Sequence, residues 1–222
     1  MNNLENKNRI AAVIPFFNEC RTIYQIVNNT LQYVDCVIAV DDGSTDDSSN
    51  KIPEGNNITL IKIKENRGKG FALREGLIEG VKKGFTQIIT IDADLQHNPD
   101  EIPLLIRELI NFDIVIGNRL NNIVNMPLHR KMSNKITSFL LSLKTGEKII
   151  DSQCGFRAYR AEIIKNIKTI KNGYEAESEI LIKASRKGYK IGFTDISTIY
   201  GNEESKMSPV KTTFNFIKVL FN

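Results

Sequence analysis

The sequence predicts one α/β domain built on a doubly wound, mainly parallel sheet. Short apolar runs rich in Val and Ile recur along the first half of the chain, and a helical spacing of apolar residues follows most of them. Strands that alternate with helices in this way are typical of parallel sheets with helices on both faces. The length of 222 residues suits one large domain better than two very small ones.

The strands expected in the first half of the chain are buried apolar runs. They are Ile10 to Pro15, Cys36 to Val40, Ile58 to Ile63, Ile88 to Ile91 and Asp113 to Gly117. A helix after the first strand carries Ile23, Ile26, Val27, Leu31 and Val34. A second helix opens at Asn66 to Gly70 and buries Leu73, Gly76, Leu77, Gly80 and Val81. A third is capped by Asn98, with Pro99 at its first position.

The pattern changes after Met126, where an amphipathic helix is expected from Leu128 to Leu143. Its apolar side carries Met132, Ile136, Phe139, Leu140 and Leu143, and its basic side carries Arg130, Lys131 and Lys135. A turn over 151–157 leads into a strand through Tyr159. The elements expected after it are a helix from Tyr174 to Lys187 ended by Gly188, a strand from Ile191 to Tyr200 and a terminal helix from Ser208.

Composition excludes several classes of protein. The net charge of +4 is too small to indicate nucleic acid as the main partner. Cys20, Cys36 and Cys154 form no C-x-x-C pair, so neither a disulfide framework nor a zinc site is expected. The polar N-terminus does not resemble a signal peptide, and no window reaches the roughly 18 apolar residues that span a bilayer. We therefore expect a cytoplasmic protein.

Asp92-Ala93-Asp94 follows the fourth expected strand and is the most informative motif. Residues two apart in an extended segment point to the same side, so both carboxylates can face one site. Mg²⁺ is typically held by one or two carboxylates plus substrate phosphates. Asp41 and Asp42 end an earlier strand, and parallel sheets bind ligands at the carboxyl ends of their strands. The sequence thus predicts a metal–nucleotide site at this edge, with Mg²⁺ or Mn²⁺ as the cofactor.

Simpler interpretations of several residues remain open. Carboxylates after strands also hold turns, so one of Asp41 and Asp42 could serve only that purpose, with base or ribose contact expected of at least one. Gly68-Lys69-Gly70 lacks the spacing of a Walker loop, and its glycines serve either ligand contact or close helix packing. His97 is either a hydrogen-bonding surface residue or part of the chemistry. The basic residues near Arg130 form either a solvated face or a phosphate contact.

An ordered set of motifs spans nearly the whole chain, from Ile10 to about Lys206. The motifs are Ile14-Pro15-Phe16-Phe17-Asn18-Glu19, Val40-Asp41-Asp42-Gly43-Ser44-Thr45-Asp46, Asn66-Arg67-Gly68-Lys69-Gly70, Asp92-Ala93-Asp94-Leu95-Gln96-His97, Ile116-Gly117-Asn118-Arg119 and Gly155-Phe156-Arg157-Ala158-Tyr159. With this set the sequence resembles family 2 glycosyltransferases of the Rossmann-like GT-A fold. Within that family it is most similar to the dolichyl- and polyprenyl-phosphate sugar synthases. Each motif alone is weakly specific, whereas their order is highly specific.

The resemblance implies a role for each matching residue. The nucleotide-sugar pocket would be lined by Pro15, Phe17, Asn18, Glu19, Asp41, Asp42, Lys69, Gly70, Asp92 and Ala93. The metal would be held by Asp92, Asp94 and Gln96, and the acceptor phosphate by Arg119, Arg130, Lys131 and Arg157. The candidate catalytic residues are Asp94, Arg119, Asp151 and Glu175.

The same resemblance suggests how the chain is divided. Residues 1–8 would form a flexible tail, 9–206 the catalytic domain and 207–222 an amphipathic helix. Within the catalytic domain, 9–120 would bind the nucleotide sugar and 121–206 the acceptor. The Q-x-x-R-W signature of processive synthases is absent and the chain has no Trp, so a polysaccharide synthase is not expected. The stretch Thr198 to Lys206 is longer and more acidic than in many relatives, which leaves the acceptor open.

The expected function is metal-dependent, inverting transfer from a UDP- or GDP-linked sugar to a polyprenyl phosphate. The alternatives are transfer to a hydroxyl of a growing glycan and a non-catalytic sugar-nucleotide-binding scaffold. A hydroxyl acceptor needs a base, for which Asp151 and Glu175 are the candidates, whereas a phosphate is already anionic and needs arginines. The helices expected at 128–143 and from Ser208 are compatible with a peripheral place on the cytoplasmic membrane face and with a homodimer.

Overall fold

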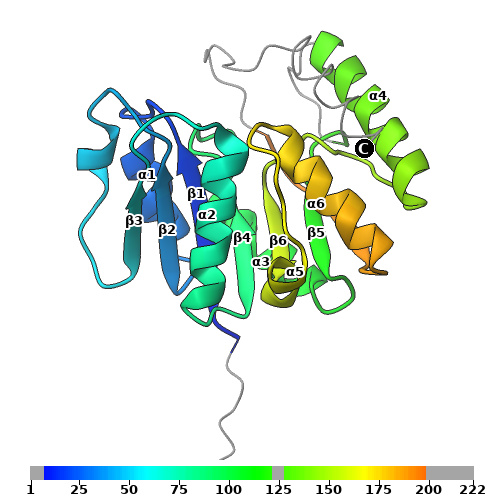
Figure 1. The fold of residues 1–222 in the computed structure, drawn as a ribbon, viewed down its shortest axis with the longest axis horizontal. Helices are drawn as coiled ribbons and strands as arrows, with labels where there is room; N and C mark the ends of the chain where they lie inside the picture. The colour runs from blue at the N-terminus through cyan, green and yellow to red at the C-terminus, as the bar shows by residue number, and fades with distance from the viewer. Residues whose placement is uncertain (1–7, 122–127, 199–222) are drawn as a thin grey trace, which may run out of the picture.

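The structure is a computed structural model that describes residues 8–121 and 128–198. Within these residues the centre is a seven-stranded sheet in the order β3-β2-β1-β4-β6-β5-β7 (Figure 1). The strands are β1 (Ile10–Phe16), β2 (Cys36–Asp41), β3 (Ile58–Lys62), β4 (Gln87–Thr90), β5 (Ile114–Asn118), β6 (Arg157–Arg160) and β7 (Ile191–Asp195). All pairs are parallel except those of β6 with β4 and β5. The predicted doubly wound, mainly parallel sheet is confirmed.

Helices cover both faces of the sheet (Figure 1). One face carries α2 (Lys69–Lys82), α5 (Ala161–Asn166) and α6 (Glu175–Arg186), and the other carries α1 (Ile23–Thr30) and α3 (Ile102–Glu108). The 3₁₀ turns η1 (Ser48–Lys51) and η2 (Pro99–Glu101) lie in the connections after β2 and β4. Because both faces are covered, β1 and β2 are apolar and buried along almost their whole length.

Local sequence signals explain where two helices lie. Asn98 caps the turn before α3 as predicted, with its side chain accepting a hydrogen bond from the Asp100 N–H at 3.2 Å. A Cβ at Gly76 would overlap the Val13 side chain, so this glycine lets α2 approach β1 closely. Close packing of this kind is what the glycines of the second expected helix allow.

Some element ends differ from the prediction. α1 ends at Thr30 and does not reach Val34, because the chain turns through hydrogen bonds from the Gln32 and Tyr33 N–H groups to the carbonyls of Asn29 and Thr30. β7 ends at Asp195, and α5 was not predicted because it is only 6 residues long. Tyr200, the terminal helix from Ser208 and nearly all of the 1–8 tail lie outside the described residues.

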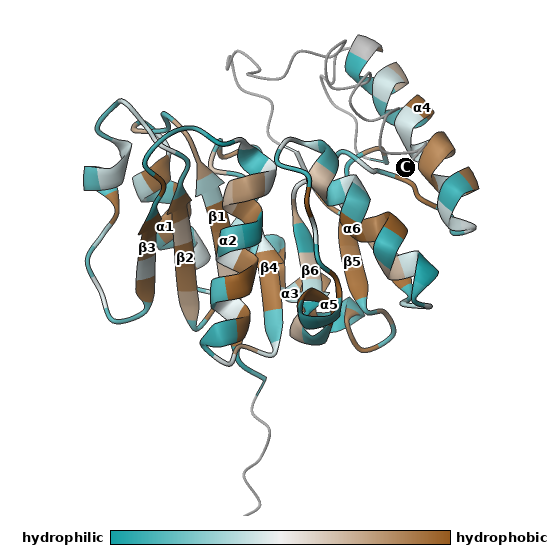
Figure 2. Cartoon of the chain, viewed as in Figure 1, coloured by the Kyte–Doolittle hydropathy of each residue, from teal (hydrophilic) through white to brown (hydrophobic). Residues whose placement is uncertain are grey.

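The helix α4 (Leu128–Thr145) lies beyond the carboxyl edge of the sheet and packs on α6 (Figure 1). It is amphipathic as predicted and carries both hydrophilic and hydrophobic residues (Figure 2). Most of its predicted apolar side is exposed, although Leu140 packs partly against the core. Met132, Ile136 and Phe139 keep 56%, 52% and 62% of their surface exposed, whereas Asn134, Thr137 and Ser138 on the inner side are buried. The common arrangement, in which the apolar face packs on the protein, does not hold for α4. Among the described residues no helix combines the length and apolar content needed to cross a bilayer.

Candidate active site

The carboxyl ends of β1, β2 and β4 bring the acidic loops together. Phe16 pairs with Asp41 in the β1–β2 register, and the Asp42 N–H donates to the Phe16 carbonyl at 2.9 Å. β4 flanks β1 on its other side, and Asp92 follows the end of β4 at Thr90. Because neighbouring parallel strands end at the same edge, the predicted gathering of the acidic motifs at one edge is confirmed for these loops.

The loop after β1 is held by the loop after β2. Asn18 has a positive φ of 54°, and its side-chain oxygen accepts a hydrogen bond from the Thr45 N–H at 2.8 Å. The Asn18 and Glu19 N–H groups donate to the hydroxyls of Ser44 and Ser48, at 2.9 and 2.7 Å. Phe17, which precedes Asn18, is half-buried. The Asn18 amide thus joins the two loops.

Asp41 and Asp42 are both buried and both hold loops. The Asp41 carboxylate accepts hydrogen bonds from the Ser44 N–H at 2.7 Å and from the Ser49 hydroxyl, which confirms the turn-holding role expected for one of the pair. Asp42 accepts from the N–H groups of Arg67 and Gly68 at 2.9 and 2.8 Å. Burial raises the pKa of Asp42, and these two N–H groups oppose the rise. Contact of either carboxylate with a nucleoside stays a prediction.

Lys69, in the first turn of α2, joins a carboxylate after β4, Asp92, to one on α6, Glu177. Its ammonium lies 2.6 Å from Asp92 Oδ1 and 3.6 Å from Glu177 Oε2. Although burial alone would raise the pKa of Asp92, the Lys69 charge holds that pKa below its usual range. Burial alone would lower the pKa of Lys69, but Asp92 and Glu177 raise it. Asp92, Lys69 and Glu177 therefore form a largely buried charged cluster.

Asp94 and Gln96 lie beside this cluster, and both side chains are half-buried. Asp94 Oδ1 accepts a hydrogen bond from the Gln96 N–H at 3.1 Å, which closes a tight turn through Leu95 with its φ of 59°. Within the described part of the chain, no three or more His, Cys, Asp or Glu side chains are grouped to hold a metal by themselves. The residues present therefore fit Mg²⁺ or Mn²⁺ only as it is bound with substrate phosphates, through one or two protein oxygens.

Arg119, just after β5, forms a bidentate ion pair with the fully buried Asp151. Arg119 Nε and Nη2 donate to Asp151 Oδ2 and Oδ1 at 2.8 and 2.9 Å, and the Arg119 N–H adds a bond at 3.1 Å. Asn134 of α4 donates to Oδ1 at 2.6 Å. Burial alone would raise the pKa of Asp151, but the Arg119 charge and these hydrogen bonds lower it. A carboxylate held in this way is a poor proton acceptor.

Arg157, expected at the acceptor phosphate, is fully buried. Its guanidinium donates to the carbonyls of Ser152, Cys154 and Glu177 at 2.8, 2.7 and 3.1 Å. It also lies 3.8 Å from the Glu177 carboxylate. A side chain with no exposed surface cannot contact an acceptor, so that expectation was wrong. Arg157 instead ties the loop before β6 to α6.

The remaining candidate residues differ in how deeply they are buried. Pro15 and Ala93 are buried, and Gly70 packs against the carbonyl of Gly173, so the packing alternative explains this glycine. Glu19 and Glu175 are half-buried, and the Glu175 carboxylate lies against Gly173. The backbone of α4 begins with Leu128, which puts Arg130 and Lys131 in its first turn, both half-buried.

His97 is buried and is not a surface residue. Its ring lies against Phe156 with the ring centroids 5.4 Å apart, and its Nδ1 atom has no hydrogen-bond partner among the described residues. Burial lowers the pKa of His97 to about 4, although Asp92 opposes the change. The imidazole is therefore neutral at physiological pH. Whether it takes part in the chemistry stays untested.

Sequence reasoning missed two buried residues of the site, Glu177 and Asn134. Both stand on helices that were predicted, but no motif marks them. Asn134 and Ser138 stand four residues apart and so share one helix face. That polar spacing, opposite the apolar side of α4, was the available signal for Asn134.

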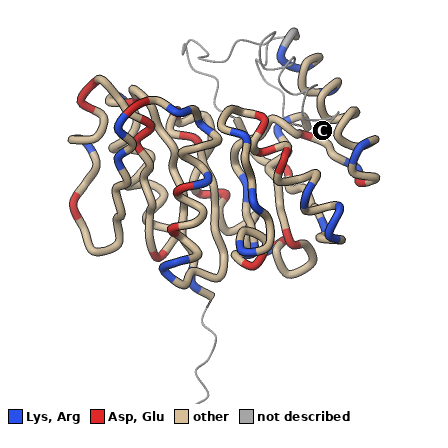
Figure 3. The backbone as a smooth tube through the Cα atoms, in the orientation of Figure 1, with Lys and Arg blue, Asp and Glu red and all other residues tan. Residues whose placement is uncertain are grey.

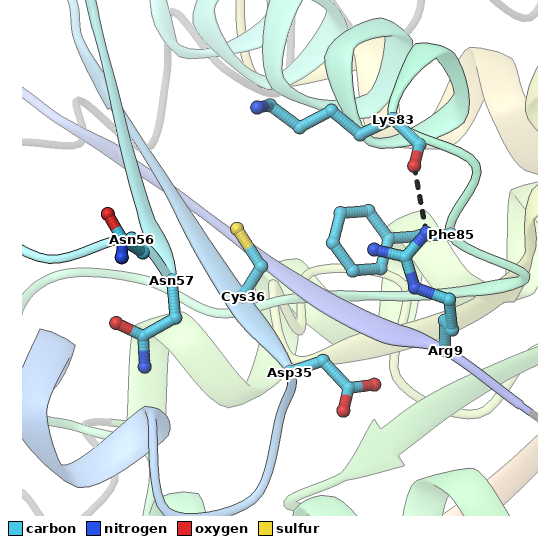
Figure 4. A pocket seen from close by; sticks show the side chains of 7 residues that line it. All are labelled: Arg9, Asp35, Cys36, Asn56, Asn57, Lys83 and Phe85. Carbon is cyan, nitrogen blue, oxygen red and sulfur yellow. Dashed lines mark hydrogen bonds between the residues drawn. The ribbon is translucent and has the colours of Figure 1, made fainter.

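A pocket of about 470 Å³ lies at the opposite edge of the sheet, where strands begin (Figure 4). Its lining residues are Arg9, Asp35, Cys36, Asn56, Asn57, Lys83 and Phe85. The Arg9 guanidinium donates to the Lys83 carbonyl at 3.1 Å and lies 4.6 Å from the centre of the Phe85 ring. Through these contacts Arg9, just before β1, packs against the segment that follows α2. The pocket is separate from the acidic loops at the carboxyl edge.

Comparison with known proteins gives one family. Residues 11–168 match the model described as Glycosyl transferase family 2. The UDP-N-acetylglucosamine–dolichyl-phosphate N-acetylglucosaminyltransferase of Methanococcus voltae is 34% identical over 86% of this chain and 86% of the relative. The dolichol-phosphate mannosyltransferase of Pyrococcus furiosus is 30% identical over 96% of this chain and 63% of the relative.

Solved structures show the same fold. Glucosyl-3-phosphoglycerate synthase from Mycobacterium tuberculosis, in complex with Mn²⁺, UDP-glucose and phosphoglyceric acid, superposes with a TM-score of 0.78. The match covers 97% of this chain and 79% of that chain at 20% sequence identity. At this identity the likeness establishes the fold alone.

Proposed function

Because this chain belongs to glycosyl transferase family 2 and is a glycosyltransferase, we propose that it moves a sugar from a nucleotide diphosphate to a polyprenyl phosphate with inversion. The names of the relatives support this choice, since those of Methanococcus voltae and Pyrococcus furiosus are named for dolichyl-phosphate and dolichol-phosphate. The observation that carries the proposal is the pairing of Asp151 with Arg119. It makes Asp151, one of the two candidate bases, the counter-ion of an arginine.

The acceptor step needs no proton transfer. An oxygen of the acceptor phosphate, already anionic, attacks the anomeric carbon from the face opposite the leaving group. The new C–O bond forms as the bond to the nucleotide diphosphate breaks, and the electron pair leaves with the diphosphate. Arg119 orients the attacking phosphate through charge-assisted hydrogen bonds. Arg130 and Lys131, in the first turn of α4, add positive charge for the same anion.

The donor lies along the acidic loops in this proposal. Phe17 and the turns held by Asn18, Asp41 and Asp42 line the nucleoside, and Asp94 and Gln96 face the diphosphate. A divalent cation there would neutralise the charge that develops on the leaving diphosphate, so no general acid is required. The Mn²⁺ in the complex of glucosyl-3-phosphoglycerate synthase supports a metal of this kind. Asp92, paired with Lys69, then contributes mainly by fixing the loop.

The direct test compares polyprenyl phosphate with polyprenol, the same chain without its phosphate. Purified protein is incubated with each acceptor, a panel of UDP- and GDP-linked sugars, and Mg²⁺ or Mn²⁺. We expect a sugar phospholipid, identified by mass, with the anomeric configuration opposite to that of the donor. A glycan acceptor is tested under the same conditions, and its glycosylation with no transfer to polyprenyl phosphate would support the glycan alternative and refute the proposal.

Replacing Phe17 by Ala is expected to raise the donor KM about tenfold with a smaller effect on kcat. A nucleoside contact stabilises the ground state and the transition state about equally, so its loss appears mainly in KM. Titration calorimetry with UDP and GDP checks the same loss as weaker binding. Tyr24→Ala is the control, because Tyr24 is an exposed aromatic residue on α1. Equal nucleotide affinity in the Phe17 variant and the parent would show that Phe17 does not contact the nucleotide.

We further propose that the outer side of α4 contacts the membrane that holds the lipid acceptor. Leu128, Met132, Ile136, Phe139 and Leu143 are exposed apolar residues on this helix. Basic residues lie at both ends of α4, Arg130 and Lys131 in its first turn and Lys144 in its last (Figure 3). Apolar residues on one side and basic residues beside them are typical of helices that lie in the membrane interface.

Vesicle flotation tests the membrane contact. The parent protein is expected to float with vesicles of anionic lipid and to dissociate as salt is raised, because salt screens the basic residues. Replacing Ile136 and Phe139 together by Glu should reduce binding at least about tenfold. The matched control is Ile110→Glu on the exposed residue that follows α3. Equal flotation of the double variant and the control would contradict the assignment of this surface.

A further inference from the structure

The inner side of α4 buries three polar residues beside Leu141, whereas several apolar residues of the same helix are exposed. Asn134, Thr137 and Ser138 are 1%, 2% and 3% exposed. Burying polar side chains is unfavourable unless their hydrogen bonds are satisfied. The orientation of α4 therefore depends on hydrogen-bond partners inside the protein as well as on the burial of Leu141.

These partners form a chain of contacts that ends at the arginine of the site. The Ser138 hydroxyl lies 3.1 Å from Asn134 Oδ1 and 3.0 Å from the Ser152 hydroxyl, and it accepts a hydrogen bond from the Ser152 N–H at 2.9 Å. Asn134 Nδ2 donates to Asp151 Oδ1 at 2.6 Å. Asp151 then holds Arg119 by its Nε, Nη2 and backbone N–H groups.

The geometry points to Asn134 as the residue that positions Arg119, by fixing the carboxylate of Asp151; for its catalytic meaning this rests on the proposed function of Arg119 at the acceptor phosphate. A bidentate pair fixes the plane of a guanidinium only if the carboxylate itself cannot rotate. Asp151 Oδ2 receives both the Nε and the backbone N–H of Arg119, whereas Oδ1 receives Nη2 and the Asn134 amide. Asn134 is thus the contact to Oδ1 that comes from another element of the fold.

The chemical type of residue 134 matters as much as its position. A neutral amide gives Asp151 a donor without adding charge, so it does not compete with Arg119 for the carboxylate. A lysine or arginine would offer a second cation, and a carboxylate would repel Asp151 and attract Arg119. An amide anchored through its own oxygen by Ser138 has one preferred orientation, with its nitrogen toward Asp151.

The test uses Asn134→Asp, which keeps the side-chain shape but removes the donor and adds charge. Asn134→Ser keeps a shorter donor and serves if the first variant does not fold. Thr137→Val is the matched control, because Thr137 is buried on the same side and its hydroxyl contacts the Ser133 and Asn134 carbonyls, Ser152 and the Gln153 amide, but neither Asp151 nor the Asn134 side chain. Two quantities are measured: the acceptor KM against the donor KM, and hydrogen exchange of the Arg119 Nε–H by ¹⁵N NMR.

Asn134→Asp is expected to raise the acceptor KM about tenfold, as loss of a hydrogen bond to a charged group implies. The donor KM should stay within about twofold, and the Arg119 Nε–H should exchange about tenfold faster. Asn134→Ser should change both quantities in the same direction by less, and Thr137→Val should change neither. Exchange rates in Asn134→Asp equal to those in Thr137→Val would overturn the inference. Faster exchange with an unchanged acceptor KM would uphold the positioning and refute the proposed acceptor role of Arg119.

Discussion

Asp94→Asn is expected to abolish sugar transfer while leaving the fold intact. Asp94 is half-buried beside the Asp92–Lys69 pair, in a turn closed by the Gln96 N–H. An asparagine can keep that hydrogen bond through its amide oxygen, but it loses the negative charge that would hold a cation on the leaving diphosphate. Removing such a preorganised charge interaction lowers kcat by about 100-fold or more. Steady-state kinetics with the donor and acceptor of the parent enzyme measure the loss.

Asp100→Asn provides the matched control for this variant. The same substitution is made a few residues further on, where Asp100 accepts a hydrogen bond from the Tyr33 hydroxyl at 2.8 Å away from the acidic loops. Its activity should stay within about twofold of the parent, and both variants should unfold at the parental urea midpoint. EDTA should inactivate the parent as the Asp94 substitution does. Full activity in excess chelator would contradict the metal-dependent mechanism.

Lys69→Met is expected to lower the free energy of unfolding by about 3 kcal/mol at neutral pH. The change removes one cation from between Asp92 and Glu177 and leaves both carboxylates without it. Removing one partner of a buried ion pair lowers the free energy of unfolding by about 3–5 kcal/mol. We expect a value near the lower limit because the Asp92 side chain keeps 27% of its surface exposed. Lys83→Met at the C-cap of the same helix is the control, since its 3.9 Å contact with Glu79 is largely exposed and contributes at most about 1 kcal/mol.

The loss of stability caused by Lys69→Met should become smaller as the pH falls. The folded protein holds the pKa of Asp92 below its usual range, so this pairing stabilises the fold above the unfolded pKa of about 3.9 and is lost as pH falls through the folded pKa. The difference between the parent and Lys69→Met is therefore full at pH 7 and shrinks in the acid range below the unfolded pKa. Urea unfolding at pH 7 and at about pH 3 measures both values. A difference that grows in acid would show that Lys69 does not stabilise the fold through Asp92.

The sequence predicted those parts of the fold that depend on local pattern. Apolar runs placed most of the strands, and the cap at Asn98 placed the 3₁₀ turn that leads into α3. The rule that ligands meet the carboxyl ends of parallel strands placed the acidic loops together. These signals act over a few residues, so they can be read without knowing which segments are neighbours in space.

The errors and omissions concern contacts between distant segments. The antiparallel direction of β6 follows from the path of the chain, which reaches that strand from the carboxyl edge after α4. Burial of Arg157 and the bridge from Lys69 to Glu177 depend on how α6 packs, which no motif encodes. The outward apolar side of α4 goes with the burial of Leu141 and of the hydrogen-bonded Asn134 on its other side. Periodicity gives the two sides of a helix but not which of them faces the protein.

The place of β6 between β4 and β5 constrains the order in which the chain can fold as it is synthesised. β1 to β4 can pair with one another as soon as they have left the ribosome. β5, in contrast, pairs with β6 and β7, which are made later. A nascent chain that ends before residue 157 leaves β5 without those neighbours and the β4 edge uncovered, and open strand edges promote aggregation. Truncation before β6 should therefore yield insoluble protein, and the last third of the chain closes the sheet that the first half begins.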